Sequence, residues 1–171
     1  MRSSVTVDRR GIVAAVAATF ALSGCSAIQL PSGTATLDPI AFFTGKSSGR
    51  GSLDTLIASP VDVTVESVGT PVPGGLRLVQ RIREGSKRPR VRVWIIRKGE
   101  DGVYSGTLTD AKGEVWMRTQ GPIASITYHT PSGLRIDQQL ALQQDGRTIL
   151  NRLEARRFGI RLAVLNETIR K

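Results

Sequence analysis

The chain has 171 residues, with 24 lysines and arginines against 14 aspartates and glutamates, which gives a net charge of +10. This length fits one domain of ordinary size. A single cysteine cannot form an internal disulfide, and one cysteine with one histidine cannot make the usual zinc site. Only an acidic oxygen site for a hard cation stays open by composition.

The first 24 residues are typical of an export signal. Three arginines precede an apolar run of small residues over 11–22, which is too short to span a bilayer. Because Arg9-Arg10 is also similar to a twin-arginine signal, the general and twin-arginine export routes both stay open. The run ends in a sequence that resembles a bacterial lipobox, formed by Leu22, Ser23, Gly24 and Cys25.

Cys25 is the predicted site of lipid attachment. Two or three acyl chains on this residue would anchor the protein to a membrane without spanning it. Ser26 stands where enterobacterial lipoproteins retained in the inner membrane have aspartate. We therefore predict a bacterial cell-envelope protein, anchored to the outer membrane and facing the periplasm, with residues 25–36 as a flexible tether.

Residues 37–171 are predicted to form one β domain. A short helical turn is expected over 37–43, before glycines open the first strand. From residue 60 onward, turns with glycine, proline or aspartate recur about ten to thirteen residues apart, and Val, Ile, Leu and Thr fill the segments between them. These segments leave no room for the helices that parallel strands need, so the strands are predicted to be antiparallel.

Alternation of side chains predicts which face of each strand is buried. Leucine and isoleucine alternate with arginine over residues 76–83, which is typical of a sheet with one dry face and one wet face. Applied to the next segment, the same rule predicts that Arg92 and Trp94 point outward, opposite an apolar series that begins at Val91.

The last third of the chain carries the strongest turn signal. Asp145-Gly146 predicts a hairpin with a type I′ turn, which requires positive φ at both central residues. Residues 148–158 fit a helix or a strand by apolar spacing, and we predict a strand.

These elements predict an all-β fold class. The simplest topology is an antiparallel up-and-down meander closed into a barrel of eight to ten strands, because closure removes exposed strand edges. A barrel of this size can enclose one small ligand. We expect its aliphatic lining, with few aromatic residues, to leave part of the interior unfilled.

No catalytic motif emerges from the sequence. His129 lacks a nucleophile elbow, and Gly45-Lys46-Ser47 lacks the earlier glycine of a phosphate-binding loop, because Ile40 stands there. Acidic residues are scattered, which does not favour paired-carboxylate or metal-assisted catalysis. We predict a protein without enzymatic activity, metal or cofactor, and lipid modification inside the barrel remains as the enzymatic alternative.

Several short motifs, in their order along residues 37–171, resemble an uncharacterised family of proteobacterial lipoproteins, the DUF3833 family. The resemblance implies a lipocalin-like, calycin-type barrel and supplies no established activity. The motifs are Phe42-Phe43, Gly45, Gly49, Gly51, Arg92-Val93-Trp94, Tyr104-Ser105-Gly106, Asp110, Gly113, Asp145-Gly146-Arg147, Asn151 and Glu167-Thr168.

Five of these residues form our candidate cluster, which either closes one end of the barrel or contacts a ligand. They are Arg92, Trp94, Tyr104, Asp110 and Glu167. The outward direction predicted for the first two favours closure.

The leading functional hypothesis is a membrane-anchored lipoprotein whose barrel binds a small apolar ligand or lipid. Removal of the leader takes away three arginines and one aspartate, which leaves a net charge of +8. The alternative hypothesis is therefore an envelope protein whose basic surface docks on anionic lipid, lipopolysaccharide or a protein partner. Nucleic acid is not an expected partner of an exported protein, although it is the usual partner of basic surfaces.

Overall fold

The structure, a computed structural model, describes residues 35–171. The predicted signal peptide, the lipobox with Cys25 and nearly all of the predicted tether lie outside the described residues. No helix in the range 35–171 has the length and hydropathy needed to cross a bilayer.

One short helix and ten strands make up the described part of the chain. They are α1 (Pro39–Phe43), β1 (Gly45–Thr55), β2 (Val61–Val72), β3 (Gly75–Glu84), β4 (Arg90–Lys98), β5 (Val103–Leu108), β6 (Val115–Gln120), β7 (Ile123–His129), β8 (Arg135–Leu142), β9 (Thr148–Arg157) and β10 (Ile160–Arg170).

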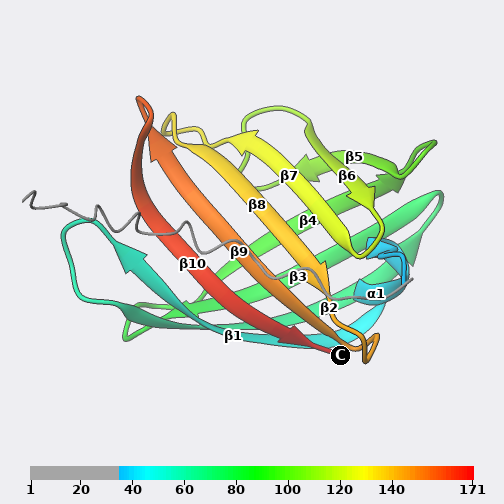
Figure 1. Ribbon diagram of the computed structural model, residues 1–171, viewed down its shortest axis with the longest axis horizontal. Coiled ribbons are helices and arrows are strands. Elements are labelled where there is room, and N and C mark those ends of the chain that lie inside the picture. The colour runs from blue at the N-terminus through cyan, green and yellow to red at the C-terminus, as the bar shows by residue number, and fades with distance from the viewer. Residues whose placement is uncertain (1–34) are drawn as a thin grey trace, which may run out of the picture.

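The strands form a closed antiparallel barrel (Figure 1). Each strand pairs with its neighbours in sequence, and β1 pairs with β10 to complete the ring. The predicted all-β, up-and-down barrel is therefore confirmed, at the upper end of the predicted strand number. The short helix near residue 40 and the strand over 148–158 are also confirmed.

Helix α1 lies at one end of the barrel, which we call the α1 end. Asp38 caps the helix, because its carboxylate accepts hydrogen bonds from the backbone N–H groups of Ile40 and Ala41 at 2.9 and 3.1 Å. The same carboxylate pairs with Lys98 of β4 at 3.2 Å, which ties the cap to the wall. Phe42, a residue of the helix, is buried in the main hydrophobic core.

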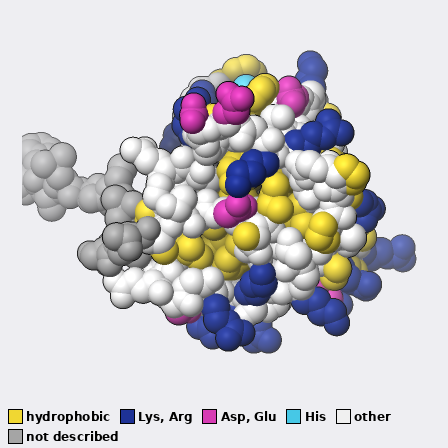
Figure 2. Space-filling model, turned by 90° about the vertical axis from the view of Figure 1, so that its right-hand side faces the viewer, with side chains coloured by type: hydrophobic (Ala, Val, Ile, Leu, Met, Phe, Trp, Pro, Cys, Tyr) yellow, Lys and Arg dark blue, Asp and Glu magenta, His cyan; other side chains and the backbone are white. Residues whose placement is uncertain are grey.

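Figure 2 looks onto the α1 end, where hydrophobic side chains lie in the middle of the face together with basic and acidic ones, and further lysines and arginines lie toward its margin. At the opposite end, which we call the loop end, the β1–β2 loop and the β9–β10 turn project from the left of Figure 1. A smaller hydrophobic cluster of Val63, Val65 and Ile82 lies inside the barrel, separate from the main core.

The hairpin at Asp145-Gly146 is confirmed, but its predicted turn type is wrong. Gly146 has a φ of 64°, whereas Asp145 is absent from the residues with positive φ. The Asp145 carboxylate instead accepts hydrogen bonds from the backbone N–H groups of Arg147 and Thr148, which stabilises a longer loop. Both central residues have positive φ in two other hairpins, at Asp101-Gly102 and Phe158-Gly159.

The predicted orientation of β4 is also wrong. Arg92 and Trp94 face the barrel interior, whereas Val91 lies outside with 61% of its surface exposed. The cause is the register with β3, which places Arg92 beside Gln80 on the inner face. Because β4 carries apolar residues on both faces, alternation alone could not distinguish its two sides.

Candidate functional site

A layer of polar side chains lies inside the barrel, beside the main core and, on β2 and β3, next to the smaller cluster. These residues occupy inward positions on two opposite arcs of the wall, β2–β4 and β8–β10. The polar layer consists of Ser67, Gln80, Arg92, Gln138, Asn151 and Glu167.

Gln80 organises the first arc. Its side-chain oxygen accepts hydrogen bonds from Arg92 Nε at 3.0 Å and from Trp94 Nε1 at 3.1 Å. Its amide nitrogen donates to Ser67 Oγ at 3.3 Å. The indole of Trp94 also meets the ring of Tyr128 edge to face, with centroids 6.3 Å apart. These contacts fix Arg92 and Trp94 in one arrangement.

Asn151 organises the second arc. Its amide nitrogen donates to Glu167 Oε2 at 2.7 Å, and its oxygen accepts from Gln138 Nε2 at 2.9 Å. Gly49 of β1 leaves room for the carboxylate, because a Cβ atom at this position would come within 1.8 Å of Glu167 Oε1. The absence of a side chain at Gly49 thus allows the Glu167 carboxyl group to fold against the wall.

Three buried polar atoms have no hydrogen-bond partner among the described residues: Glu167 Oε1, Gln138 Oε1 and Ser47 Oγ. Glu167 and Gln138 each expose only 7% of their surface. A buried oxygen that makes no hydrogen bond loses its hydration without replacement, so such atoms favour a bound water or ligand group. Two of these oxygens, Glu167 Oε1 and Gln138 Oε1, belong to side chains that line one cavity.

The charges of the polar layer are unbalanced. Burial lowers the pKa of Arg92, but arginine remains protonated in proteins. Burial raises the pKa of Glu167, against the opposing effects of the Asn151 hydrogen bond and the Arg92 charge. Arg92 forms no ion pair with a carboxylate in the described part of the chain. The layer consequently holds a cation beside a carboxyl group that resists ionisation, and the charge of Asp110 outside the layer opposes the effect of burial on the pKa of Arg92.

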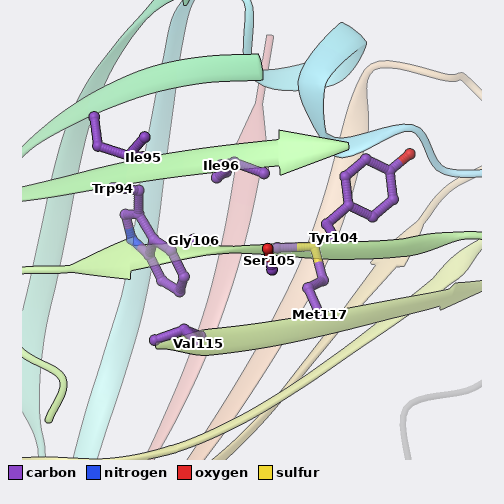
Figure 3. A pocket seen from close by; sticks show the side chains of 8 residues that line it. All are labelled: Trp94, Ile95, Ile96, Tyr104, Ser105, Gly106, Val115 and Met117. Atoms are coloured by element: carbon purple, nitrogen blue, oxygen red, sulfur yellow. The ribbon is translucent and has the colours of Figure 1, made fainter. Parts of the chain in front are cut away.

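An apolar pocket lies next to the polar layer, on the β4–β6 side (Figure 3). The indole of Trp94 extends from β4 toward Val115 of β6, and the Met117 side chain lies farther along the same pocket (Figure 3). Trp94, Ile96 and Met117 line both spaces, which makes the polar layer and the apolar pocket continuous neighbours.

Both spaces are small. The cavity at the polar layer has a volume of about 30 Å³ and the apolar pocket about 10 Å³. At about 10 to 15 Å³ per water, the larger space holds roughly two water molecules. At these two spaces the expected unfilled volume is small, and long polar side chains line the larger one.

The structure brings together three of the five residues in the candidate cluster. Arg92, Trp94 and Glu167 all line the cavity. Tyr104 lines the apolar pocket, and its hydroxyl points away from Trp94 in Figure 3. Asp110 lies instead on the surface near the loop end, where it pairs with Arg90 at 2.7 Å.

Sequence analysis did not select Gln80 and Gln138 as site residues. Each stands at an inward position between apolar neighbours, Gln80 between Leu78 and Ile82 in the alternating series of β3. A long amide at an inward position is the signal that could have identified them, because buried amides require partners. Within residues 35–171, no three His, Cys, Asp or Glu side chains are grouped to hold a metal ion.

Comparison with solved structures gives a likeness in fold. The S-type phycobiliprotein lyase CPES from Guillardia theta superposes with a TM-score of 0.59 at 8% sequence identity. The match covers 77% of this chain and 89% of the lyase. At this identity the likeness concerns the lipocalin-like barrel alone.

No curated protein matches the chain in sequence. A family model described as "Protein of unknown function (DUF3833)" matches residues 19–171, which include the whole barrel. The predicted membership of the DUF3833 family is thereby confirmed. The chain belongs to the DUF3833 family of proteins of unknown function.

Proposed function

We propose that this protein binds a small amphiphilic carboxylate inside its barrel. The head group would lie at the polar layer and the apolar part among Trp94, Ile96 and Met117. The observation that carries the proposal is a cavity where Arg92 has no carboxylate partner among the described residues and Glu167 Oε1, which can donate a hydrogen bond when the carboxyl group is protonated, has no hydrogen-bond partner.

The chemistry of the polar layer favours a carboxylate over a wholly apolar ligand. An arginine can donate two parallel hydrogen bonds to a carboxylate, which is a strong and directional contact. A protonated Glu167 would donate a further hydrogen bond to the same group, since burial raises its pKa. A hydrocarbon without a head group would leave the Arg92 guanidinium and Glu167 Oε1 without a ligand partner.

The small volume of the interior sets a condition on binding. A ligand larger than two waters requires a side chain or α1 to move, and α1 touches the wall mainly through β2 and β3. Entry from the α1 end would place the ligand tail in the apolar pocket and its head at Arg92. We therefore propose that α1 moves when the ligand enters.

We infer binding without catalysis, although the structural neighbour is named as a lyase. The polar layer contains one carboxyl group and no histidine or cysteine, so it lacks the paired acid and base that general catalysis requires. The lipobox sequence further supports a lipid anchor at Cys25 and a location at the outer membrane, facing the periplasm. A barrel anchored in this way would take up its ligand from a membrane or hold the ligand close to one.

Fluorescence of Trp94 tests the proposal. The chain has two tryptophans, so a Trp116→Phe variant leaves Trp94 as the reporter inside the barrel. We expect the Trp94 emission to show that decanoate binds at least tenfold more tightly than decanol. A hydrogen bond to a charged group contributes about 1.5 to 3 kcal/mol, which corresponds to at least this ratio of affinities. Equal binding of the acid and the alcohol, or no response to either, would contradict the proposal.

Arg92→Gln provides the decisive variant. It should abolish the preference for the acid while leaving weak binding of the alcohol. Arg81→Gln is the matched control, because Arg81 lies on the exposed face of β3. Loss of the preference in both variants would assign it to general surface charge instead of the polar layer.

A further inference from the structure

We propose that the loop end of the barrel carries a membrane-contacting corner, which docks on a bilayer with anionic headgroups. This inference concerns the outer surface and does not depend on the ligand proposed for the interior. We define the corner by two adjoining segments, Leu56–Pro60 of the β1–β2 loop and Arg157–Arg161 of the β9–β10 turn.

The two segments lie side by side. The backbone N–H of Leu56 donates a hydrogen bond to the carbonyl of Leu162 at 2.9 Å. Phe158 and Gly159 form the two-residue turn between β9 and β10, and Ile160 pairs with Arg157 beyond it. The closure of the barrel through β1 and β10 thus joins residues far apart in sequence into one corner.

The corner concentrates exposed hydrophobic side chains. Seven large hydrophobic residues are exposed in the described part of the chain, and four of them lie here. Ile57 and Phe158 expose 94% and 92% of their surface, and Leu56 and Ile160 more than half. Single exposed hydrophobic residues are ordinary on a protein surface, but a group at one projecting corner indicates a contact site.

The backbone at Phe158 strengthens this inference. Its φ is 50°, a left-handed conformation that a bulky residue adopts at a cost and that glycine or asparagine would adopt more easily. The ring gains no burial within the described chain in return. Strain that packing does not offset is a reason to look for a function outside the fold.

The charge of the corner selects an anionic bilayer as the occupant. Arg157 lies with its guanidinium 5.4 Å from the centre of the Phe158 ring, and Arg161 follows directly after Ile160. The nearby acid Glu154 is already paired with Arg152, Arg156 and Arg161. Apolar tips beside arginines match the interface of a bilayer, where the tips enter the acyl boundary and the arginines meet the phosphates.

Site-specific fluorescence on the full chain tests the membrane-contacting corner. Cys25→Ser removes the single cysteine, so Ile57→Cys or Phe158→Cys can carry one environment-sensitive nitrobenzoxadiazole label. Val91→Cys and Trp116→Cys are matched controls, because these residues are exposed hydrophobics on the barrel wall. Reading each position separately distinguishes contact by the corner from recruitment of the chain by another segment.

With vesicles of phosphatidylcholine and phosphatidylglycerol, we expect a severalfold rise in emission and quenching by spin-labelled lipids at positions 57 and 158 only. Arg157→Gln with Arg161→Gln should weaken the response about tenfold, and Arg77→Gln with Arg81→Gln should not. The same response at all four positions, or none at 57 and 158, would overturn the proposal. If emission at 57 and 158 instead rises with protein concentration in the absence of vesicles, the corner mediates self-association, and this outcome would also overturn the proposal.

Discussion

The two ends of the barrel use hydrophobic residues in opposite ways. At the α1 end, Phe42 and Phe43 are turned inward and buried in the main core. At the loop end, Ile57 and Phe158 are turned outward and lie exposed on the β1–β2 loop and the β9–β10 turn. The difference shows that one end of the barrel is stabilised by packing, while the other leaves its hydrophobic surface available for contact.

The largest expected effect comes from exchanging the two kinds of phenylalanine for alanine. Phe43→Ala should lower the free energy of unfolding by about 3 to 5 kcal/mol, because it opens a cavity in the main core. Phe158→Ala should change it by less than about 0.5 kcal/mol, because the ring packs on nothing buried. Urea unfolding measures both, and equal losses would remove the distinction between the ends.

A smaller effect is expected where α1 meets the wall. A Cβ atom on Gly69 would come within 1.9 Å of the Phe43 carbonyl oxygen, a backbone atom that cannot move alone. Gly69→Ala should therefore displace the helix and lower stability by about 1 to 3 kcal/mol. Gly74→Ala is a useful contrast with open space around it, although its φ of 70° adds strain of its own. An unchanged urea midpoint for Gly69→Ala would show that α1 is loosely placed.

At the loop end, relief of backbone strain should give a modest gain. Phe158→Asn places a residue that tolerates positive φ in the turn, so we expect stability to rise by about 1 kcal/mol. The same variant should lose the fluorescence response to anionic vesicles, which can be followed at Ile57→Cys. A variant that gains stability and keeps the full membrane response would separate the strain from the contact.

Between the ends, the polar layer should make stability depend on pH. Burial raises the pKa of Glu167 in the folded protein, so its protonated form is favoured by folding. The stability that this group contributes is complete below the pKa of an unfolded glutamate and is lost as pH rises through the folded pKa. Glu167→Gln should therefore become more stable than the parent chain as pH rises, with the smallest difference at acid pH. Urea titrations at several pH values measure this, and a constant difference would contradict it.

Much of the fold follows from local chemistry in the sequence. Evenly spaced turns with glycine define the strands, and Asp38 followed by Pro39 defines the start of α1. These signals depend on residues that are close together in sequence, so they can be recognised without the tertiary structure. The hairpin at Asp145 was correctly located for the same reason.

The orientation of β4 and the composition of the site depend on register, which local pattern does not determine. Alternation predicts an outward Arg92 because an apolar series begins at Val91, yet pairing with β3 brings Arg92 to Gln80. The Gln80 side-chain oxygen then accepts hydrogen bonds from Arg92 Nε and Trp94 Nε1, two donors that burial would otherwise penalise. The corner at the loop end was missed for a similar reason, since it exists only once β1 and β10 meet.

The pairing of β1 with β10 also bears on how this protein is made. The partners Ser48 and Arg170 lie at opposite ends of the described chain, so the ring cannot close until nearly all of it has been synthesised. Until then, β1 and β9 each present an unpaired edge that can add a strand from another molecule. Contacts so distant in sequence form slowly. Nascent copies thus pass through an interval in which they are prone to aggregate, and a chain shortened by its last strand would remain in that condition.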